Sequence, residues 1–336
     1  MARKATSVDV ARLAGVSQAT VSYVLNGRTD QAIRDETRRK VIAAARELGY
    51  VPNLAARALV TGRTQMIALW VPFAFHSVFG HVVEHVMAHA RHSGYRILIV
   101  QIHDETHETM LTGALRSTLQ VDGILAFDAE GLAESMLEHA PHLPPMVTFG
   151  PTWSTKTDHV GVDLAASGAV AVEHLLSIGC RRIAYATFAD RLWPGEKRYG
   201  AYLQAMAAAG LEPLTIGLEQ GDMDDAYRGV REWFATAGHD AADGLYCWND
   251  ESAIGAVRAL ADLGLRVPDD VAVIGSDGVR ETAFTTPTLS TMAQPFTAAC
   301  ELAWDYLRTR MEQPDLPLRQ TVLPMELVVR ASTTRV

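Results

Sequence analysis

Small polar side chains gather on one short segment near the start of the chain, where they could bind a polyanion. Ser17, Gln18, Thr20 and Ser22 carry hydroxyl and amide groups, which donate hydrogen bonds to phosphates and to base edges. Residues 1–60 contain ten Lys and Arg against five Asp and Glu, a net +5. The whole chain has a net charge of −9, so the remainder carries −14. A basic head on an acidic body predicts a polyanionic partner at one end of the molecule.

Three short helices are expected to position these side chains. Thr6 is followed three positions later by Asp9, the pattern of a helix cap with an acidic partner. Gly15 permits the left-handed backbone of a tight turn, and Ser17 can cap a second helix. The pattern predicts helices over residues 8–14, 18–25 and 35–48, of which the first two form a helix-turn-helix.

The rest of the chain contains no motif that indicates catalysis. It has no Gly-rich phosphate loop, no HExxH and no GxSxG, and no spaced pair of carboxylates suggests a general acid and base. Cys180, Cys247 and Cys300 are far apart and lack the spacing of a zinc site or a disulfide framework. We therefore expect neither an enzyme nor a cofactor or metal site.

From Gln65 onward, short apolar runs alternate with amphipathic segments. This alternation predicts doubly wound parallel sheets, and the length allows two subdomains with a cleft between them. Ligands of such sheets bind outside the carboxyl ends of the strands. Strands are expected over residues 66–71, 95–102, 123–127, 146–149, 160–162, 182–187, 244–248 and 271–275, with intervening helices such as 78–93, 165–178, 198–209 and 251–263.

The hydropathy pattern argues against a membrane location. No apolar stretch reaches the roughly 18 residues of a membrane span, and the first residues lack the apolar centre of a signal peptide. We expect a cytoplasmic protein with no membrane partner.

The first sixty residues resemble the DNA-binding head of the lac-repressor (LacI/GalR) family. The resemblance rests on VARLAGVSQATVSYVLNG at residues 10–27 and on LGYVPNLAAR at residues 48–57. It implies base reading in the major groove, phosphate binding, and a hinge helix over residues 53–60 whose apolar side chain wedges into the minor groove. The implied base readers are Gln18, Ala19 and Tyr23, the phosphate binders Ser17, Thr20, Ser22 and Asn26, the hinge contacts Asn53, Ala56, Arg57 and the wedge Leu59, with Thr6 as a further DNA contact.

The resemblance continues through the core and implies a periplasmic-binding-protein fold, a homodimer and a small-molecule effector, with sugars or sugar derivatives as one class. Its motifs are VGVD at residues 160–163, NDESAIGA at 249–256 and LRVPDDVAVIGSD at 265–277. The implied effector contacts are His76, Phe79, Asp163, Lys197, Met223, Asn249, Asp277 and Phe296.

Two of these positions depart from the family pattern. Lys197 stands where the family has Arg, and the neighbouring Arg198 is expected to point elsewhere on its helix. Met223 stands where the family has an aromatic residue. Lysine cannot form the bidentate contacts of arginine, and this set favours a neutral polyol or a cationic group as the effector.

The combined interpretation is an α/β protein with a helix-turn-helix head at residues 1–51, a hinge helix and linker at 52–63, and a core at 64–336. The first core subdomain is expected to comprise residues 64–163 with 294–324, and the second 164–293 with 325–336. We expect a sequence-specific transcriptional regulator that, by analogy with the family, acts as a repressor. It would bind a pseudo-palindromic double-stranded DNA operator as a homodimer and be controlled by a small molecule in the cleft.

Three alternatives remain open. The same DNA-binding protein with a degenerate cleft could respond to a protein partner. A solute-binding protein would share the core but would need a signal peptide and no basic head, and an α/β enzyme would need a catalytic constellation.

Four histidines, His81, His85, His89 and His92, share one face of a predicted helix. That face is either solvated or a metal- or pH-dependent dimer contact.

Overall fold

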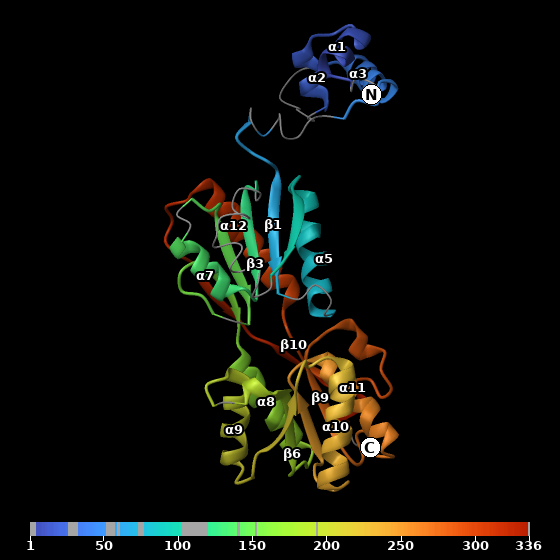
Figure 1. Ribbon diagram of the computed structural model, residues 1–336, viewed down its shortest axis with the longest axis vertical. Coiled ribbons are helices and arrows are strands. Elements are labelled where there is room, and N and C mark those ends of the chain that lie inside the picture. Colours follow the sequence, from blue (N-terminus) through green and yellow to red (C-terminus); the bar gives the residue numbers. More distant parts are fainter. Residues whose placement is uncertain are drawn as a thin grey trace. The chain divides into compact units, whose positions relative to one another are not determined.

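The computed structural model describes residues 5–25, 33–51, 58, 61–72, 77–102, 120–139, 142–151, 153–192 and 194–334. The chain divides into two compact units, Met1–Thr64 and Gln65–Val336. Figure 1 shows the helical first unit and the larger α/β second unit, here called the head and the core. Within the described residues, no helix has both the length and the apolar character that a membrane span requires.

The head contains the three helices that the sequence predicts, α1 (Ser7–Ala14), α2 (Gln18–Leu25) and α3 (Asp35–Glu47). The cap of α1 is reciprocal: the Asp9 N–H donates to Thr6 Oγ1 at 3.3 Å, and the Thr6 N–H donates to Asp9 Oδ2 at 2.9 Å. Gly15 ends the helix with φ at 67°, the left-handed conformation that the turn requires. A small core that includes Val10, Val21 and Val41 holds the three helices together.

The first sheet of the core is parallel throughout, in the order β11-β5-β4-β3-β1-β2. One face packs on α5 and α12, and the other packs on α7. The strands are β1 (Met66–Val71), β2 (Arg96–Gln101), β3 (Gly123–Phe127), β4 (Met146–Gly150), β5 (Asp158–Val162) and β11 (Gln320–Leu323), and the helices are α5 (Ser77–His92), α7 (Glu130–His139) and α12 (Phe296–Glu312).

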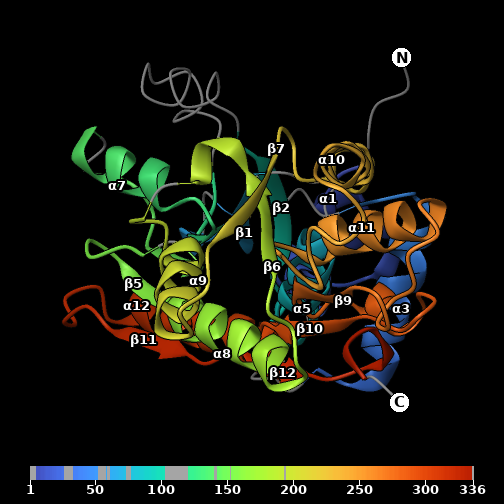
Figure 2. The same cartoon turned by 90° about the horizontal axis from the view of Figure 1, so that it is seen from below.

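The second sheet has the order β12-β10-β9-β8-β6-β7 and is parallel except for β12, which pairs antiparallel with β10. Helices α10 and α11 cover one face, and α8 and α9 cover the other, as Figure 2 shows from below. The strands are β6 (Ile183–Phe188), β7 (Leu214–Leu218), β8 (Gly244–Cys247), β9 (Ala272–Asp277), β10 (Ser290–Ala293) and β12 (Glu326–Val328), and the helices are α8 (Leu164–Ser177), α9 (Lys197–Ala208), α10 (Met223–Ala237) and α11 (Asp250–Asp262).

Three passages of the chain connect the two sheets. They follow β5 at Asp163, β10 at Gln294 and Pro295, and β11 at residues 324–325. We call the part around the first sheet the first subdomain and the part around the second sheet the second subdomain. The predicted α/β class with two doubly wound sheets is confirmed, with β12 as an antiparallel edge strand.

The histidines of α5 do not form a solvated face. The His81 ring stacks on Phe296 at a centroid distance of 6.0 Å, and the His89 ring stacks on Trp304 at 6.4 Å. His85 Nε2 lies 3.5 Å from the Thr297 hydroxyl. Three of the four rings are therefore half-buried against α12, because that helix covers the same sheet face as α5. Among the described residues, no group of three or more His, Cys, Asp or Glu could hold a metal ion.

Candidate nucleic-acid interface and ligand pocket

Helix α2 presents the small polar residues of the head to solvent. Ser17, Gln18, Ala19 and Ser22 are exposed, and Thr20 is half-buried, as is Tyr23. Ser17 Oγ accepts the Thr20 N–H at 3.1 Å, so this hydroxyl already caps α2. Gln18 Nε2 donates to Ser7 Oγ at 2.8 Å, which links α2 to the start of α1.

Two of the predicted DNA contacts, Ser17 and Thr6, already cap helices, which limits the hydrogen bonds that their side chains can form with DNA. Thr6 is half-buried, and its side chain is occupied by Asp9, to which the hydroxyl donates at 2.7 Å. Its contribution is therefore mainly to fix the start of α1. The other predicted DNA contacts, Asn26, Asn53, Ala56, Arg57 and Leu59, lie outside the described residues.

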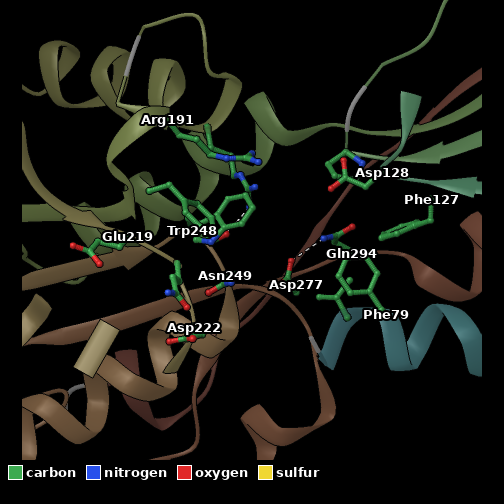
Figure 3. Close-up of a pocket in the computed structure, with 15 residues that line it drawn as sticks. Phe79, Phe127, Asp128, Arg191, Glu219, Asp222, Trp248, Asn249, Asp277 and Gln294 are labelled. Atoms are coloured by element: carbon green, nitrogen blue, oxygen red, sulfur yellow. Dashed lines mark hydrogen bonds between the residues drawn. The ribbon is translucent and has the colours of Figure 1, made fainter. Parts of the chain in front are cut away.

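The core contains a pocket of about 450 Å³ that the two subdomains line together. Its walls are formed by the carboxyl ends of strands in both sheets and by the first turn of α5, the arrangement expected for ligand sites in open parallel sheets. The volume lies within the range of small-molecule sites. The lining residues, most of which are labelled in Figure 3, are Val78, Phe79, Phe127, Asp128, Pro151, Phe188, Arg191, Arg198, Glu219, Gln220, Asp222, Trp248, Asn249, Asp277 and Gln294.

Three of the predicted effector contacts meet in this pocket. Phe79 comes from the first turn of α5, Asn249 precedes α11, and Asp277 ends β9. Asn249 Oδ1 accepts the Ser252 N–H at 2.7 Å, and its Nδ2 donates to the Gly221 carbonyl at 3.1 Å. The side chain of Asn249 thus holds the start of α11 against the β7–α10 loop while it faces the cavity.

Four predicted contacts lie away from the pocket lining. Asp163 caps α8 by accepting the Ala166 N–H at 2.9 Å, and Phe296 is buried in the first subdomain against His81. Met223 is the first residue of α10 and is 38% exposed, and the preceding Asp222 lines the pocket in its place. Lys197 lines a separate hollow between α8 and α9. His76 lies outside the described residues.

The expectation that Arg198 points away from the pocket is wrong. Helix α9 begins at Lys197 and is capped by Glu196, which accepts the Tyr199 N–H at 2.6 Å. This start turns Arg198 inward, where it is 3% exposed and its Nη1 donates to the Trp248 carbonyl. Its guanidinium carbon lies 4.2 Å from the centre of the Trp248 ring. The chain therefore supplies an arginine to the pocket one position after Lys197.

Two buried carboxyl groups lie close together at the pocket, and one of them, Asp277, lines it. Asp250 Oδ2 accepts the N–H groups of Gly278 and Val279 at 2.7 and 2.8 Å, and its Oδ1 accepts the Thr291 hydroxyl at 2.6 Å. Asp277 Oδ1 accepts Gln294 Nε2 at 2.8 Å. Burial raises the pKa of Asp277 to about 8, with a further contribution from the nearby Asp250 carboxylate. Burial also raises the pKa of Asp250 to about 6, although its hydrogen bonds oppose that shift.

Most of the pocket was missed by reasoning from motifs. Phe127, Phe188, Trp248 and Gln294 each end a strand or follow one within a single residue. The rule that ligands bind at the carboxyl ends of parallel strands could have found them, because three of these strands were predicted from their apolar runs. Arg191 had no such signal, since it lies in the short 3-10 turn Ala189–Arg191 after β6.

Comparisons with known proteins identify the family. Residues 7–53 match the bacterial regulatory proteins of the lacI family, and residues 172–333 match the periplasmic binding protein-like domain. The HTH-type transcriptional repressor PurR of Erwinia tasmaniensis is 32% identical over 312 residues, which cover 91% of this chain and 90% of that protein. The chain belongs to the lacI family.

Other members agree with this assignment along nearly the whole chain. The ribose operon repressor of Haemophilus influenzae is 29% identical over 330 residues, 98% of each chain. The fold is similar to that of the lac repressor dimer bound to operator and the anti-inducer ONPF, with a TM-score of 0.82, 22% identity, and coverage of 99% of this chain and 100% of that one. A complex of the transcriptional regulator CelR with cellobiose gives a TM-score of 0.67 at 28% identity and 98% and 99% coverage. Membership of the lacI family makes this chain a DNA-binding transcriptional regulator.

Proposed function

We propose that this lacI-family chain is a homodimeric, cytoplasmic repressor that binds a pseudo-palindromic operator and is controlled by a sugar or sugar derivative. The observation that carries the proposal is the pocket of about 450 Å³ between the two subdomains. A ligand there touches both subdomains at once, so its binding free energy depends on their relative orientation.

The pocket lining supports a sugar-like ligand. The aromatic rings of Phe79, Phe127 and Trp248 supply flat apolar surfaces. The Phe79 and Phe127 rings meet edge to face, with their centres 5.5 Å apart. Asp277, Gln294 and the arginines supply hydrogen-bonding groups. A lining of apolar surface with a few directed polar groups is typical of small-molecule sites. Relatives support the class: one is the ribose operon repressor, and a similar fold was solved with cellobiose.

The head supports operator binding through α2 in the major groove. Gln18, Ala19 and Ser22 form an exposed face on a helix that follows a tight turn, the geometry of a recognition helix. Two heads in a symmetric dimer would read two half-sites about one helical turn of DNA or a multiple of it apart. We also propose that Asn53, Ala56, Arg57 and Leu59 contact the minor groove at the centre of the site.

The test is selection of bound duplexes from a random pool with the purified full-length protein, followed by affinity measurements at several salt concentrations. We expect a two-fold-symmetric site. Gln18→Ala should weaken binding to it by roughly 5- to 150-fold, the cost of one lost base contact. The matched control is Gln204→Ala on α9, which should bind as the natural chain does.

Two further results bear on the proposal. Leu59→Ala should reduce preference for the selected centre of the site more than it reduces binding to unrelated DNA. Enrichment of no symmetric site, with only salt-sensitive nonspecific binding, would contradict the proposal if the result were the same with and without candidate sugar effectors.

A further inference from the structure

Two guanidinium groups meet at one indole ring in the wall of the pocket. The Arg191 guanidinium carbon lies 4.6 Å from the centre of the Trp248 ring, and that of Arg198 lies 4.2 Å from it. The two positive charges are therefore within about 9 Å of each other, a separation at which like charges in a pocket repel. Arg191 also lies over Phe188, at 5.3 Å from the ring centre. The aromatic rings hold both planar groups in place.

The two arginines differ in how many hydrogen bonds and ion pairs they form with the rest of the protein. Arg198 is buried, donates to the Trp248 carbonyl, and has a carboxylate oxygen of Glu196 4.0 Å from its Nε. Its Nε has no hydrogen-bond partner among the residues that the structure describes. Arg191 is exposed at the pocket wall and forms no ion pair or hydrogen bond with any residue that the structure describes. The donors of Arg191 are therefore available to a ligand, with the second positive charge close by.

Arg198 pairs with Glu196, whereas none of the acidic residues that line the pocket forms an ion pair with Arg191. Asp277 accepts a hydrogen bond from Gln294, and its burial beside Asp250 raises its pKa, which favours the uncharged form. Asp222 caps α10 by accepting the Asp225 N–H at 2.8 Å. Figure 3 shows Arg191 beside Trp248. Arg191 thus presents a guanidinium with no ion pair among the described residues at the wall of a mixed pocket.

We propose that the effector is a sugar derivative with an anionic group, a carboxylate or a phosphate, that binds Arg191 while Arg198 contributes the second positive charge. This inference rests on the proposed function of the pocket and narrows its ligand class. A guanidinium offers two parallel N–H donors that match the two oxygens of either group. The same pairing is stronger in a partly enclosed site than in water, because the local dielectric is lower. Aromatic rings on the far side of the pocket would contact the sugar ring.

The experiment measures ligand binding to the full-length protein by calorimetry with matched pairs of compounds. Glucuronate and glucose 6-phosphate are each compared with glucose, galacturonate is compared with galactose, and gluconate is compared with glucitol. We expect at least one anionic compound to bind roughly 10- to 100-fold more tightly than its neutral partner, the difference that charge-assisted hydrogen bonds provide. Tighter binding of either the carboxylate or the phosphate compound identifies the anionic group of the effector.

Variants then assign the effect to Arg191. Arg191→Gln should lose the preference for the anionic compound, and Arg191→Lys should recover part of it, because a lysine keeps the charge but not the planar fork. Arg308→Gln, an exposed arginine on α12, is the matched control and should leave binding unchanged. Operator binding without ligand checks that each variant is folded.

The outcomes separate this proposal from the one on which it rests. Neutral sugars that bind as tightly as their anionic partners, with no effect of Arg191→Gln, would overturn the anionic ligand and leave the pocket as a sugar site. Binding of no compound from either set to a protein that still binds its operator would count against both proposals.

Discussion

Replacing Asp277 by Asn should change how the stability of the core depends on pH. The Asp277 carboxyl is buried at the pocket floor, 6% exposed, and accepts a hydrogen bond from Gln294. Its pKa is raised from its usual value of 3.8 to about 8 in the folded chain, mainly by burial and then by Asp250. Between these two values the folded state holds a proton that the unfolded state has lost.

The sign and size of the effect follow from this difference in bound protons. A carboxyl with a raised pKa contributes its full stability below pH 3.8 and loses that contribution as the pH rises through about 8. The loss approaches about 1.4 kcal/mol for each pH unit within this window. Between pH 6 and pH 8 the natural chain should therefore lose about 2 kcal/mol relative to Asp277→Asn, whose side chain cannot ionise.

Urea unfolding followed by tryptophan fluorescence measures this difference directly. All six tryptophans lie beyond residue 65, so the signal reports on the core and not on the head. Profiles at pH 6, 7 and 8, without DNA and at one protein concentration, give the free energy of unfolding of each chain. The matched control is Asp305→Asn, which removes an exposed carboxylate on α12 that pairs with Arg308 at 2.8 Å. Equal pH slopes for the natural chain and Asp277→Asn would refute the reasoning.

Two further predictions use the same unfolding assay. Asp158 is fully buried and accepts hydrogen bonds from Arg310 and Arg319 at 3.0 Å each. Asp158→Asn should cost about 3–5 kcal/mol of the free energy of unfolding at pH 7, because it leaves two half-buried guanidinium groups without their counter-charge. Burial alone would raise the pKa of Asp158, but the hydrogen bonds and charges of the two arginines outweigh burial and lower it. The stability that the Asp158 carboxylate contributes should therefore disappear as the pH falls through the lowered pKa. A loss of less than about 1 kcal/mol in the free energy of unfolding of Asp158→Asn at pH 7 would contradict the prediction. Glu251 in α11 accepts the Ser77 N–H and hydroxyl at 2.8 and 2.9 Å, which joins the second subdomain to the start of α5 in the first. Glu251→Ala should lower the free energy of unfolding by about 1–3 kcal/mol. The control Glu301→Ala, at an exposed position on α12, should change it by no more than about 0.5 kcal/mol. Equal losses in the two variants would show that the contact between subdomains adds no stability.

The sequence determined the head and the pattern of strands because both depend on local signals. Thr6, Asp9 and Gly15 fix the ends of α1 through contacts within a few residues of one another. The apolar runs of β1, β3 and β8 are buried on both faces of their sheets, so they read as continuous apolar stretches in the sequence. Four strands were not predicted, β7, β10, β11 and β12. The short β12 and the partly exposed β7 and β11 give no such run.

Family motifs predicted part of the pocket but could not place every side chain in it. Asn249 and Asp277 line the cavity because each stands where a strand of the second sheet ends. Lys197 and Met223 do not, because successive residues of an α-helix point about 100° apart. The start of each helix decides which neighbour faces inward, and these starts bring Arg198 and Asp222 to the cavity instead.

The sequence by itself determined the class of protein: a basic helix-turn-helix head joined to an α/β core with parallel sheets. Only the tertiary structure decided the chemistry of the pocket. Arg191, Arg198 and Trp248 come from separate elements, and the pKa of Asp277 depends on Asp250 and on burial. Such effects arise from distances between side chains in the folded chain, and helical or strand periodicity carries no information about contacts between elements that lie far apart in the sequence.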